Sequence, residues 1–288
     1  MRGDPLLAWD PSPENGSNPD LRDALPLSWS AGDNASEHDV YFGTDRDAVL
    51  DADTSDTTGI YRGRQSLTTH SPSEGVEWGG GSYYWRVDHY NTDGTISTGR
   101  TWGFTVADFI TVDDFESYND IAEGEPGSNR IYVMWIDGFG TTDNGAFVGN
   151  MDVPLTERNN PHSGAQAMPL SYDNNLKTSE ATMTLVYPRD WTEQGVTRLS
   201  LWFRGESANA PERMFVALDG NAVVYHDDPA ATQVVPWTQW VIELSAFGGL
   251  GVDLTNVDTI TIGFGTKNNP AAGGTGQMYF DDIRLYRP

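Results

Sequence analysis

Residues 199–204 read Leu199-Ser200-Leu201-Trp202-Phe203-Arg204, with a bulky apolar side chain at every second position from Leu199. Successive side chains of a β-strand point to opposite faces of the sheet, whereas a helical face repeats about every 3.6 residues. The stretch therefore predicts a strand whose Leu199, Leu201 and Phe203 face a core. Ser200, Trp202 and Arg204 are expected on the opposite face of the same sheet.

Short runs of alternating, β-branched or aromatic residues recur along the whole chain and are separated by Gly, Asn, Asp and Pro. The first run is residues 6–9, the last is residues 277–286, and one in between is residues 131–136. Almost nothing repeats at helical spacing. The sequence therefore predicts an all-β protein.

Charge and composition exclude several classes of partner. The chain of 288 residues holds 17 Lys and Arg residues against 42 Asp and Glu residues, a formal net charge of -25. Such a charge repels phosphate backbones and anionic lipid headgroups, so we expect neither nucleic acid nor a membrane surface as a partner. The sequence contains 0 Cys residues, which excludes disulfides, thiolate zinc sites and thiol nucleophiles. The same acidic, Lys-poor composition favours an extracellular protein whose leader is not present in this chain.

Two domains are predicted, over residues 1–108 and 109–288. Residues 102–106 have the pattern of a closing strand, and residues 112–116 have that of an opening strand. The linker between them is therefore very short. The unequal lengths suit a small β-sandwich followed by a larger jelly roll.

Motifs in the first domain follow one another in a characteristic order: Leu27-Ser28-Trp29, His38-Asp39-Val40-Tyr41-Phe42-Gly43-Thr44, Tyr83-Tyr84-Trp85-Arg86-Val87-Asp88, Asn91-Thr92-Asp93-Gly94 and Trp102-Gly103-Phe104. In order and spacing, residues 5–106 resemble a fibronectin type III domain. The resemblance implies a β-sandwich that serves as a spacer or docking module.

The second domain carries a further series: Asp113-Asp114-Phe115-Glu116, His162-Ser163-Gly164, Asp190-Trp191, Trp237-Thr238-Gln239-Trp240, Leu254-Thr255-Asn256-Val257-Asp258 and Tyr279-Phe280-Asp281-Asp282-Ile283-Arg284-Leu285. With the strand at residues 199–203, these motifs resemble a calcium-stabilised jelly-roll carbohydrate-binding module of the β-glucan-binding type found in cellulosomal enzymes. The resemblance covers nearly all of residues 111–288. It implies a galactose-binding-like sandwich that holds a glycan on its concave face.

Acidic residues cluster at both ends of the second domain, in residues 113–116 and at Asp281 and Asp282. The first and last strands of a jelly roll are neighbours, so these clusters are expected to approach each other. By the two-residue period, Tyr279, Asp281, Ile283 and Leu285 are expected to share one face of the last strand. If that face is the core side, Asp281 needs a compensating cation or a raised pKa.

Calcium suits such a cluster because it takes six to eight oxygen ligands and needs no nitrogen or sulfur. The resemblance implies the Glu116 and Asp281 carboxylates as ligands, with carbonyls at Asp114 and in the loop at residues 162–164, where Ser163 lies. Alternatively, these acids are solvated strand ends in a chain that is acidic throughout.

A glycan site needs aromatic rings that stack on sugar faces and polar groups that bond hydroxyls. Trp202 and Arg204 are candidates because they lie opposite the core face of their strand, although a Trp in a sandwich is more often part of the core. The glycan-contact candidates are Tyr132, Trp135, Asp137, Tyr172, Lys177, Trp202, Arg204, Tyr225 and Lys267.

No catalytic residue is identified. The five His residues have no metal-ligand spacing, and the Gly-x-Ser-x-Gly and phosphate-loop motifs are absent. We therefore expect a secreted, non-catalytic module that binds a polysaccharide. Because the protein is strongly negative, a neutral polysaccharide is favoured over an anionic one. It is expected to accompany other domains of a larger secreted protein, including those of carbohydrate-active enzymes. The alternatives are a structural or adhesive module of an extracellular assembly and, last, a jelly-roll polysaccharide lyase or hydrolase.

Overall fold

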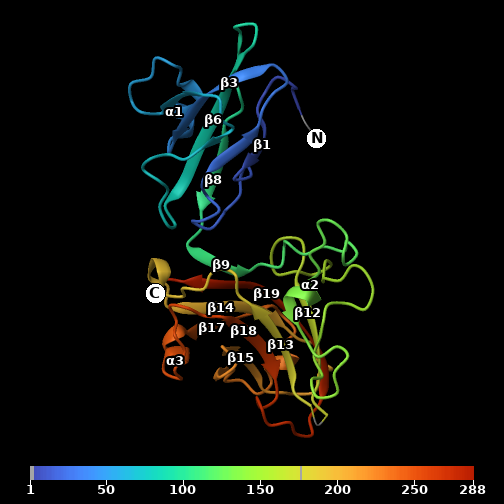
Figure 1. Cartoon of the computed structure of the whole chain (residues 1–288). Helices are drawn as coiled ribbons and strands as arrows, with labels where there is room; N and C mark the ends of the chain where they lie inside the picture. The colour runs from blue at the N-terminus through green and yellow to red at the C-terminus, as the bar shows by residue number, and fades with distance from the viewer. Residues whose placement is uncertain (1–2, 176) are drawn as a thin grey trace. The chain divides into compact units, whose positions relative to one another are not determined.

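The computed structural model describes residues 3–175 and 177–288, and the chain divides into two compact units. The first unit ends at Ile110 and the second runs from Thr111 to Pro288. The regular structure of both is almost entirely strand (Figure 1), so the prediction of an all-β protein is confirmed.

The first unit is a sandwich of a small and a larger antiparallel sheet. Its elements are β1 (Trp9–Ser12), β2 (Leu27–Ser30), β3 (Ala35–Gly43), α1 (Arg46–Asp51), β4 (Tyr61–Gln65), β5 (Thr69–His70), β6 (Gly81–Asn91), β7 (Ile96–Ser97) and β8 (Trp102–Val106). The small sheet has the order β1-β2-β5, and the larger has the order β4-β3-β6-β7 with β8 also paired to β6. Aromatic side chains fill the space between the two sheets: Trp29, Phe42, Tyr83, Trp85, Trp102 and Phe104 belong to one buried cluster.

The second unit is a larger sandwich. Its elements, starting with the strand that contains the division, are β9 (Phe109–Asp113), α2 (Ile131–Met134), β10 (Trp135–Ile136), β11 (Phe147–Val148), β12 (Met168–Asp173), β13 (Ser179–Thr184), η1 (Glu193–Gly195), β14 (Arg198–Arg204), β15 (Met214–Leu218), β16 (Ala222–Tyr225), η2 (Ala231–Gln233), β17 (Thr238–Glu243), α3 (Leu244–Gly248), β18 (Thr259–Phe264) and β19 (Thr275–Tyr286).

These strands form two sheets, with the orders β10-β13-β18-β15-β16 and β11-β12-β19-β14-β17, and β9 pairs with β19. From β12 to β15 and from β16 to β19 the chain changes sheet at every step, as it does in a jelly roll. The strand pairs within these two orders are antiparallel, and β14 lies between β19 and β17. The jelly-roll sandwich expected for this part of the chain is therefore present.

The strand at residues 199–204 is confirmed as β14, and its inner face is the predicted one. Leu199, Leu201 and Phe203 are at most 1% exposed. Full burial of each such side chain contributes on the order of 2 kcal/mol. Trp202 and Arg204 lie on the opposite face and are only partly exposed, because other side chains cover them.

Two expectations for the second unit were wrong. The run at residues 131–136 begins as the helical turn α2 and becomes extended only at Trp135 and Ile136. Its two buried side chains, Ile131 and Trp135, are four residues apart, which is the spacing of one helical face and not of a strand. The uniform alternation expected along residues 279–285 is broken within β19, where Met278 and Phe280 face the core before the break, and Ile283 and Leu285 do so after it. Tyr279 and Asp281 therefore do not share a face with Ile283 and Leu285.

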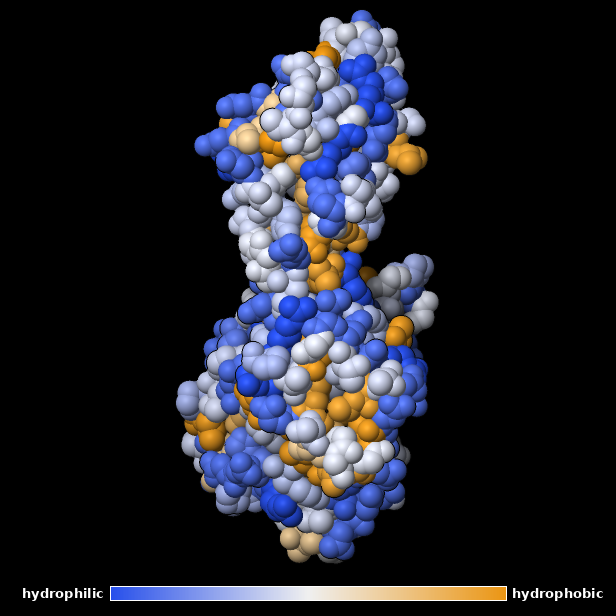
Figure 2. All heavy atoms as spheres, turned by 90° about the vertical axis from the view of Figure 1, so that its left-hand side faces the viewer, coloured by the Kyte–Doolittle hydropathy of each residue, from blue (hydrophilic) through white to orange (hydrophobic). Residues whose placement is uncertain are grey.

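The surface of the molecule is mostly polar, with apolar side chains gathered in separate places on the face that Figure 2 shows. Among the described residues, no helix has the length and apolar character that a membrane crossing requires.

Candidate functional site

A β-bulge in β19 brings two carboxylates together. Between the pairs Ser200–Arg284 and Trp202–Asp281, β14 advances by two residues while β19 advances by three. Asp282 supplies the extra residue and takes a left-handed backbone conformation with a φ of 50°. Asp281 and Asp282 are 0% and 1% exposed, so both carboxylates are removed from water.

The start of the loop at residues 162–166 binds these two carboxylates. The backbone N–H groups of His162 and Ser163 donate to Asp281 Oδ2 at 2.9 and 3.2 Å. His162 Nδ1 lies 2.7 Å from Asp282 Oδ2, and Ser163 Oγ donates to Asp282 Oδ1 at 2.9 Å. His162, Asp281 and Asp282 present one ligand-type atom each within 4.8 Å of one another. We call these three residues the carboxylate cluster.

The end of the same loop binds Glu116. The Glu116 carboxylate accepts hydrogen bonds from the backbone N–H groups of Ala165 and Gln166 at 3.0 and 3.1 Å. Gly164 has a φ of 59°, and a Cβ atom there would lie 2.3 Å from Glu116 Oε1. Glycine is therefore required at this position both for the backbone conformation and for the close approach of the carboxylate.

Burial dominates the electrostatics of the carboxylate cluster. Desolvation raises the pKa of Asp281 to about 7, and the neighbouring Asp282 carboxylate adds to the rise, while backbone hydrogen bonds oppose it. Arg284 donates to Asp282 Oδ1 at 2.5 Å and compensates part of the charge. Burial therefore disfavours the charged form of Asp281, while Asp282 has a cationic partner.

Asp113 lies near the start of the second unit, and its hydrogen-bond partners among the described residues are neutral. Its Oδ2 accepts hydrogen bonds from Tyr118 Oη at 2.6 Å and Trp135 Nε1 at 2.8 Å. Burial raises the pKa of this carboxyl to about 6. These bonds anchor a core indole, so Asp113 has a structural role.

The structure places three of the four expected metal ligands at the loop of residues 162–166. Asp281 binds its first half, Glu116 binds its second half, and Ser163 is part of it. Asp114 accepts a hydrogen bond from the backbone N–H of Glu116 at 3.1 Å. His162 and Asp282 were not predicted as side-chain ligands. The tandem Asp281-Asp282 sequence was the available signal for Asp282, but the bulge that turns its carboxylate toward Asp281 has no sequence signature.

The donors of the carboxylate cluster fit a hard divalent cation. The two buried carboxylates supply oxygen atoms, and a cation between them would offset the desolvation that raises the pKa of Asp281. His162 Nδ1 is the one nitrogen in the group. Neutral imidazole also binds transition metals, so the donor set alone does not select calcium over zinc or manganese.

A separate cleft lies among the loops beside α2, β10 and β11. Its volume is about 510 Å³, and its lining includes Tyr132, Asp137, Phe139 and Phe147. The Phe139 ring is 75% exposed and packs against Phe147 with ring centroids 5.8 Å apart. We call this the edge cleft, because β10 and β11 are the outermost strands of their two sheets.

Hydrogen bonds hold the polar groups of the edge cleft in place. Arg130 donates to Tyr132 Oη at 2.9 Å and to the Ile121 carbonyl at 2.7 Å. The carboxylate of Asp137 accepts from the backbone N–H groups of Phe139 at 2.8 Å and Val148 at 2.6 Å. The cleft therefore combines fixed donors and acceptors with exposed aromatic surface before any ligand arrives.

Two of the expected glycan contacts are instead core residues. Trp135 is 0% exposed, and its Nε1 is bonded to Asp113. Tyr172 is 2% exposed and stacks on Phe264 with ring centroids 4.6 Å apart. Both were wrong as glycan contacts, because an aromatic residue beside polar ones gives no indication of which side of the sandwich it occupies.

Trp202 and Arg204 lie together on the outer face of the larger sheet, but other side chains cover them. The Trp202 indole stacks on His162 with ring centroids 3.8 Å apart. The Arg204 guanidinium lies 3.7 Å from the Tyr279 ring centroid and pairs with Glu157 at 3.5 Å. Trp202 therefore connects this face to the carboxylate cluster, because it stacks on His162.

Tyr225 and Lys267 lie together beside the sheet β10-β13-β18-β15-β16, whereas Lys177 contacts Asp173 of β12 in the other sheet. Lys267 pairs with Glu180 through its Nζ, and its backbone N–H donates to Tyr225 Oη at 3.2 Å. Lys177 pairs with Asp173 at 3.3 Å. Both lysines already pair with acidic side chains, so their ammonium groups are less available to bind a ligand.

Of the nine expected glycan contacts, only Tyr132 and Asp137 line the edge cleft. Sequence reasoning missed Arg130, Phe139 and Phe147. The dipeptide Phe139-Gly140 in a Gly-rich loop was the available signal for Phe139, but nothing in the sequence indicates that its ring is left exposed.

Comparisons with known proteins give structural similarities only. No protein-family model matches the chain, and no curated protein matches it. A family 11 carbohydrate-binding module from Clostridium thermocellum, in complex with a β-1,3-1,4-mixed-linked tetrasaccharide, is similar at 18% identity and a TM-score of 0.36, over 54% of this chain and 95% of that chain.

Two further solved structures are similar. A family 30 carbohydrate-binding module of a cellulosomal cellulase of Clostridium thermocellum has 12% identity and a TM-score of 0.32, over 53% of this chain and 96% of that chain. An α-L-rhamnosidase of Streptomyces avermitilis complexed with L-rhamnose has 14% identity and a TM-score of 0.25, over 95% of this chain and 23% of that chain. The sandwich fold itself is defined by the strand pairing described above.

Proposed function

We propose that this protein is a secreted, non-catalytic polysaccharide-binding module whose glycan site is the edge cleft of the second unit. The observation that carries the proposal is the cleft of about 510 Å³ in which exposed aromatic surface meets bonded polar groups. Sugar rings present apolar C–H faces to aromatic side chains and hydroxyl groups to donors and acceptors. Phe139 and Tyr132 supply the first kind of contact, and Asp137 and Arg130 supply the second.

The charge of the cleft favours a neutral glycan. Its lining contains Glu123 and Asp137 against Arg130 alone, and Arg130 is already bonded to Tyr132 and to backbone carbonyls. An anionic polymer such as alginate would meet two carboxylates and a single guanidinium, which is already bonded to neutral groups. The net charge of -25 acts in the same direction at long range.

Calcium is the cation we assign to the carboxylate cluster, with a structural role. The oxygen-rich donor set and the burial of Asp281 and Asp282 support this assignment. Bound there, the ion would fix the loop at residues 162–166, which Glu116 holds from its other end. The cluster and the edge cleft have no lining residue in common, so the ion is assigned to stability and not to glycan contact.

The first unit is assigned as a fibronectin type III-like domain that accompanies the glycan-binding unit. Its three-stranded sheet β1-β2-β5 facing the sheet of β4, β3 and β6, with Trp29 and Trp85 between them, supports this assignment.

One observation favours a second candidate function, that of a structural or adhesive module. Ile136, Phe139 and Met151, which line the edge cleft, are 60%, 75% and 76% exposed. Exposed apolar groups of this kind also meet protein partners. Glycan and protein ligands are separated by the experiment below.

The test is affinity gel electrophoresis of the full chain in gels that contain mixed-linkage β-1,3-1,4-glucan, agarose, β-1,4-galactan or alginate, with calcium and with chelator. Retardation by a neutral polymer, without release of reducing ends, is expected. Phe139→Ala is expected to reduce the retardation roughly tenfold, whereas Val186→Ala, at a residue that is 84% exposed elsewhere in the second unit, is expected to leave it unchanged. Equal retardation of both variants would reject the edge cleft, and concentration-dependent self-association without retardation would favour the structural role.

A further inference from the structure

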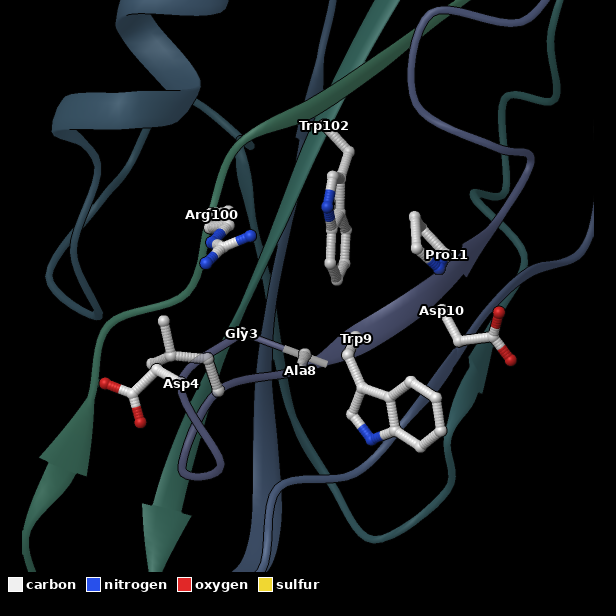
Figure 3. Close-up of a pocket in the computed structure, with 9 residues that line it drawn as sticks. Gly3, Asp4, Ala8, Trp9, Asp10, Pro11, Arg100 and Trp102 are labelled. Atoms are coloured by element: carbon white, nitrogen blue, oxygen red, sulfur yellow. The ribbon is translucent and has the colours of Figure 1, made fainter. Parts of the chain in front are cut away.

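The first unit contains a pocket of its own beside β1 and β8. Its volume is about 280 Å³, and its lining includes Asp4, Trp9, Asp10, Pro11, Arg100 and Trp102. Figure 3 shows the Trp102 indole between the guanidinium of Arg100 and the ring of Pro11, with the Trp9 indole beside β1 below them. The pocket therefore combines two indoles and a proline ring with one cationic group, which lies beside Trp102.

A β-bulge forms the β1 side of this pocket. Between the pairs Trp9–Ser30 and Ser12–Ser28, β1 advances by three residues while β2 advances by two. Asp10 takes a left-handed conformation with a φ of 55°. A non-glycine residue in this region costs free energy, and such residues gather at functional sites.

Both indoles are held by contacts outside the pocket. Trp102 is 6% exposed and packs on the buried Trp85 with ring centroids 4.6 Å apart. Trp9 is 38% exposed, and its Nε1 donates to the Ala31 carbonyl at 3.2 Å. A ligand would meet these aromatic faces in fixed positions and would lose little free energy in ordering them.

The polar groups of the pocket are available. Within the part of the chain that the structure describes, the exposed Arg100 side chain has no hydrogen bond or ion pair. A Cβ atom at Gly3 would lie 2.4 Å from an Arg100 guanidinium nitrogen, so this position leaves room for the guanidinium. The carboxylates of Asp4 and Asp10 lie at opposite sides of the pocket and point outward in Figure 3, and Asp4 Oδ1 accepts a hydrogen bond from the Leu6 backbone N–H at 3.0 Å.

We propose that this Trp9–Trp102 pocket is a sugar-binding site of the first unit, separate from the edge cleft, that takes one ring of a neutral polysaccharide. A sugar ring offers an apolar face to the indoles and oxygen atoms to the Arg100 donors, while the two carboxylates lie at the rim of the pocket. A purely apolar ligand would cover the Arg100 guanidinium without pairing it, which is unfavourable. A polyanion would meet two carboxylates for one guanidinium.

A second sugar site changes how the chain binds polymers. When one site has bound a polymer, the polymer is present at a high effective concentration at the second site of the same chain. A polysaccharide that reaches both sites is therefore bound more tightly than a short oligosaccharide of the same sugar. The first unit would then contribute to binding directly instead of serving as a spacer. This proposal stands whether or not the edge cleft binds a glycan.

The test is hydrogen–deuterium exchange of the full chain, read peptide by peptide, with soluble oligosaccharides prepared from mixed-linkage glucan, agarose and β-1,4-galactan. At least one of them is expected to slow exchange in peptides covering residues 5–12 and 99–103. Trp9→Ala and Arg100→Gln are each expected to weaken this protection about fivefold to tenfold. Leu67→Ala, at a side chain that is 67% exposed elsewhere in the first unit, is the matched control and is expected to have no effect.

The readout separates this proposal from that of the edge cleft. Protection of residues 131–150 reports the edge cleft and is expected to survive Trp9→Ala, whereas Phe139→Ala is expected to spare protection at residues 5–12. If none of the three oligosaccharides protects residues 5–12 and 99–103, or if Trp9→Ala binds as the unmodified chain does, the pocket is not a sugar site. An unchanged melting temperature of Trp9→Ala shows that lost protection is not lost folding.

Discussion

Both units contain a strand with one residue more than its partner, and in both strands an aspartate takes the left-handed conformation. Asp10 in β1 has a φ of 55°, and Asp282 in β19 has a φ of 50°. The surroundings of the two side chains differ completely. The Asp10 carboxylate is exposed at the mouth of a pocket, whereas the Asp282 carboxylate is 1% exposed and bonded to His162, Ser163 and Arg284.

The same backbone feature, a β-bulge with a left-handed aspartate, therefore has different structural consequences in the two units. In β1 the bulge shapes a concave surface that is open to solvent. In β19 it adds an acidic side chain to a buried cluster, which makes that part of the second unit dependent on whatever compensates the charge. The cost of changing each aspartate should therefore differ far more than their φ values suggest.

Titration separates the two units in the same way. The first unit buries histidines: desolvation lowers the pKa of His38 to about 4, and the neighbouring His89 adds to the decrease while Asp39 opposes it. The second unit buries carboxyls, and burial raises the pKa of Asp113 to about 6. Burial thus disfavours the charged form of His38 in one unit and of Asp113 in the other, although the first unit also contains a carboxyl, Asp88, whose pKa is raised by desolvation.

The largest expected effect comes from Asp282→Gly. Glycine suits the left-handed backbone, but the change removes the carboxylate from His162 and Ser163 and leaves the Arg284 guanidinium without this partner. Loss of one member of a buried charge pair costs about 3–5 kcal/mol. Urea unfolding of the full chain is expected to show this loss in the transition of the second unit only. Asp282→Asn, which keeps an accepting oxygen, is expected to lose less, and equal stability of the two variants would contradict the role given to the carboxylate.

Next in size are opposite pH dependences of the two units, measured in chelator. The unfolded chain protonates His38 near its ordinary pKa of 6.5, whereas the folded unit does so near 4, so the first unit loses stability as the pH falls through this interval. Asp113 titrates near 3.8 when unfolded and near 6 when folded, so its contribution is present below 3.8 and is lost as the pH rises toward 6. Each pKa difference corresponds to about 3 kcal/mol.

Peptide-resolved hydrogen exchange in urea, corrected for intrinsic rates, measures both slopes in one sample. His38→Leu is expected to flatten the slope of the first unit alone, since the Nδ1 atom of the histidine has no hydrogen-bond partner among the described residues. Slopes of the same sign in the two units would show that other groups control their titration.

Calcium is expected to stabilise the second unit and leave the first unchanged. At a free concentration 100 times its dissociation constant, a ligand of the native state contributes about 2.7 kcal/mol, which raises the melting temperature by roughly 5–10 °C for a unit of this size. Glu116→Ala combined with Asp281→Ala is expected to abolish the response to calcium and to chelator. The matched pair Glu125→Ala and Asp227→Ala, at exposed acids outside the cluster, is expected to keep it. A response that survives in the first double variant would place the ion elsewhere.

The sequence predicts well those features that follow from the alternation of apolar and polar residues along a strand. The core positions of β14 and the all-β class follow directly from it. The sequence pattern could not predict the extra residue in β19. A bulge depends on how two strands pair, and the paired residues Trp202 and Asp281 lie far apart in the sequence. The pattern also could not separate Trp135, which is fully buried, from Phe139, which is 75% exposed, because the two aromatics lie in one loop-rich segment.

The smallest expected effect concerns Asp10 and completes the comparison of the two bulges. Asp10→Gly is expected to change the stability of the first unit by no more than about 0.5 kcal/mol, because the side chain is exposed and glycine accepts the backbone conformation. Asp10→Ala is expected to cost about 1 kcal/mol more than glycine, since alanine tolerates a positive φ poorly. Urea unfolding of both variants isolates the backbone cost from the carboxylate. If the alanine and glycine variants are equally stable, β1 changes its backbone conformation at residue 10 without a cost in stability. The left-handed conformation of Asp10 would then not be required by the fold of the first unit.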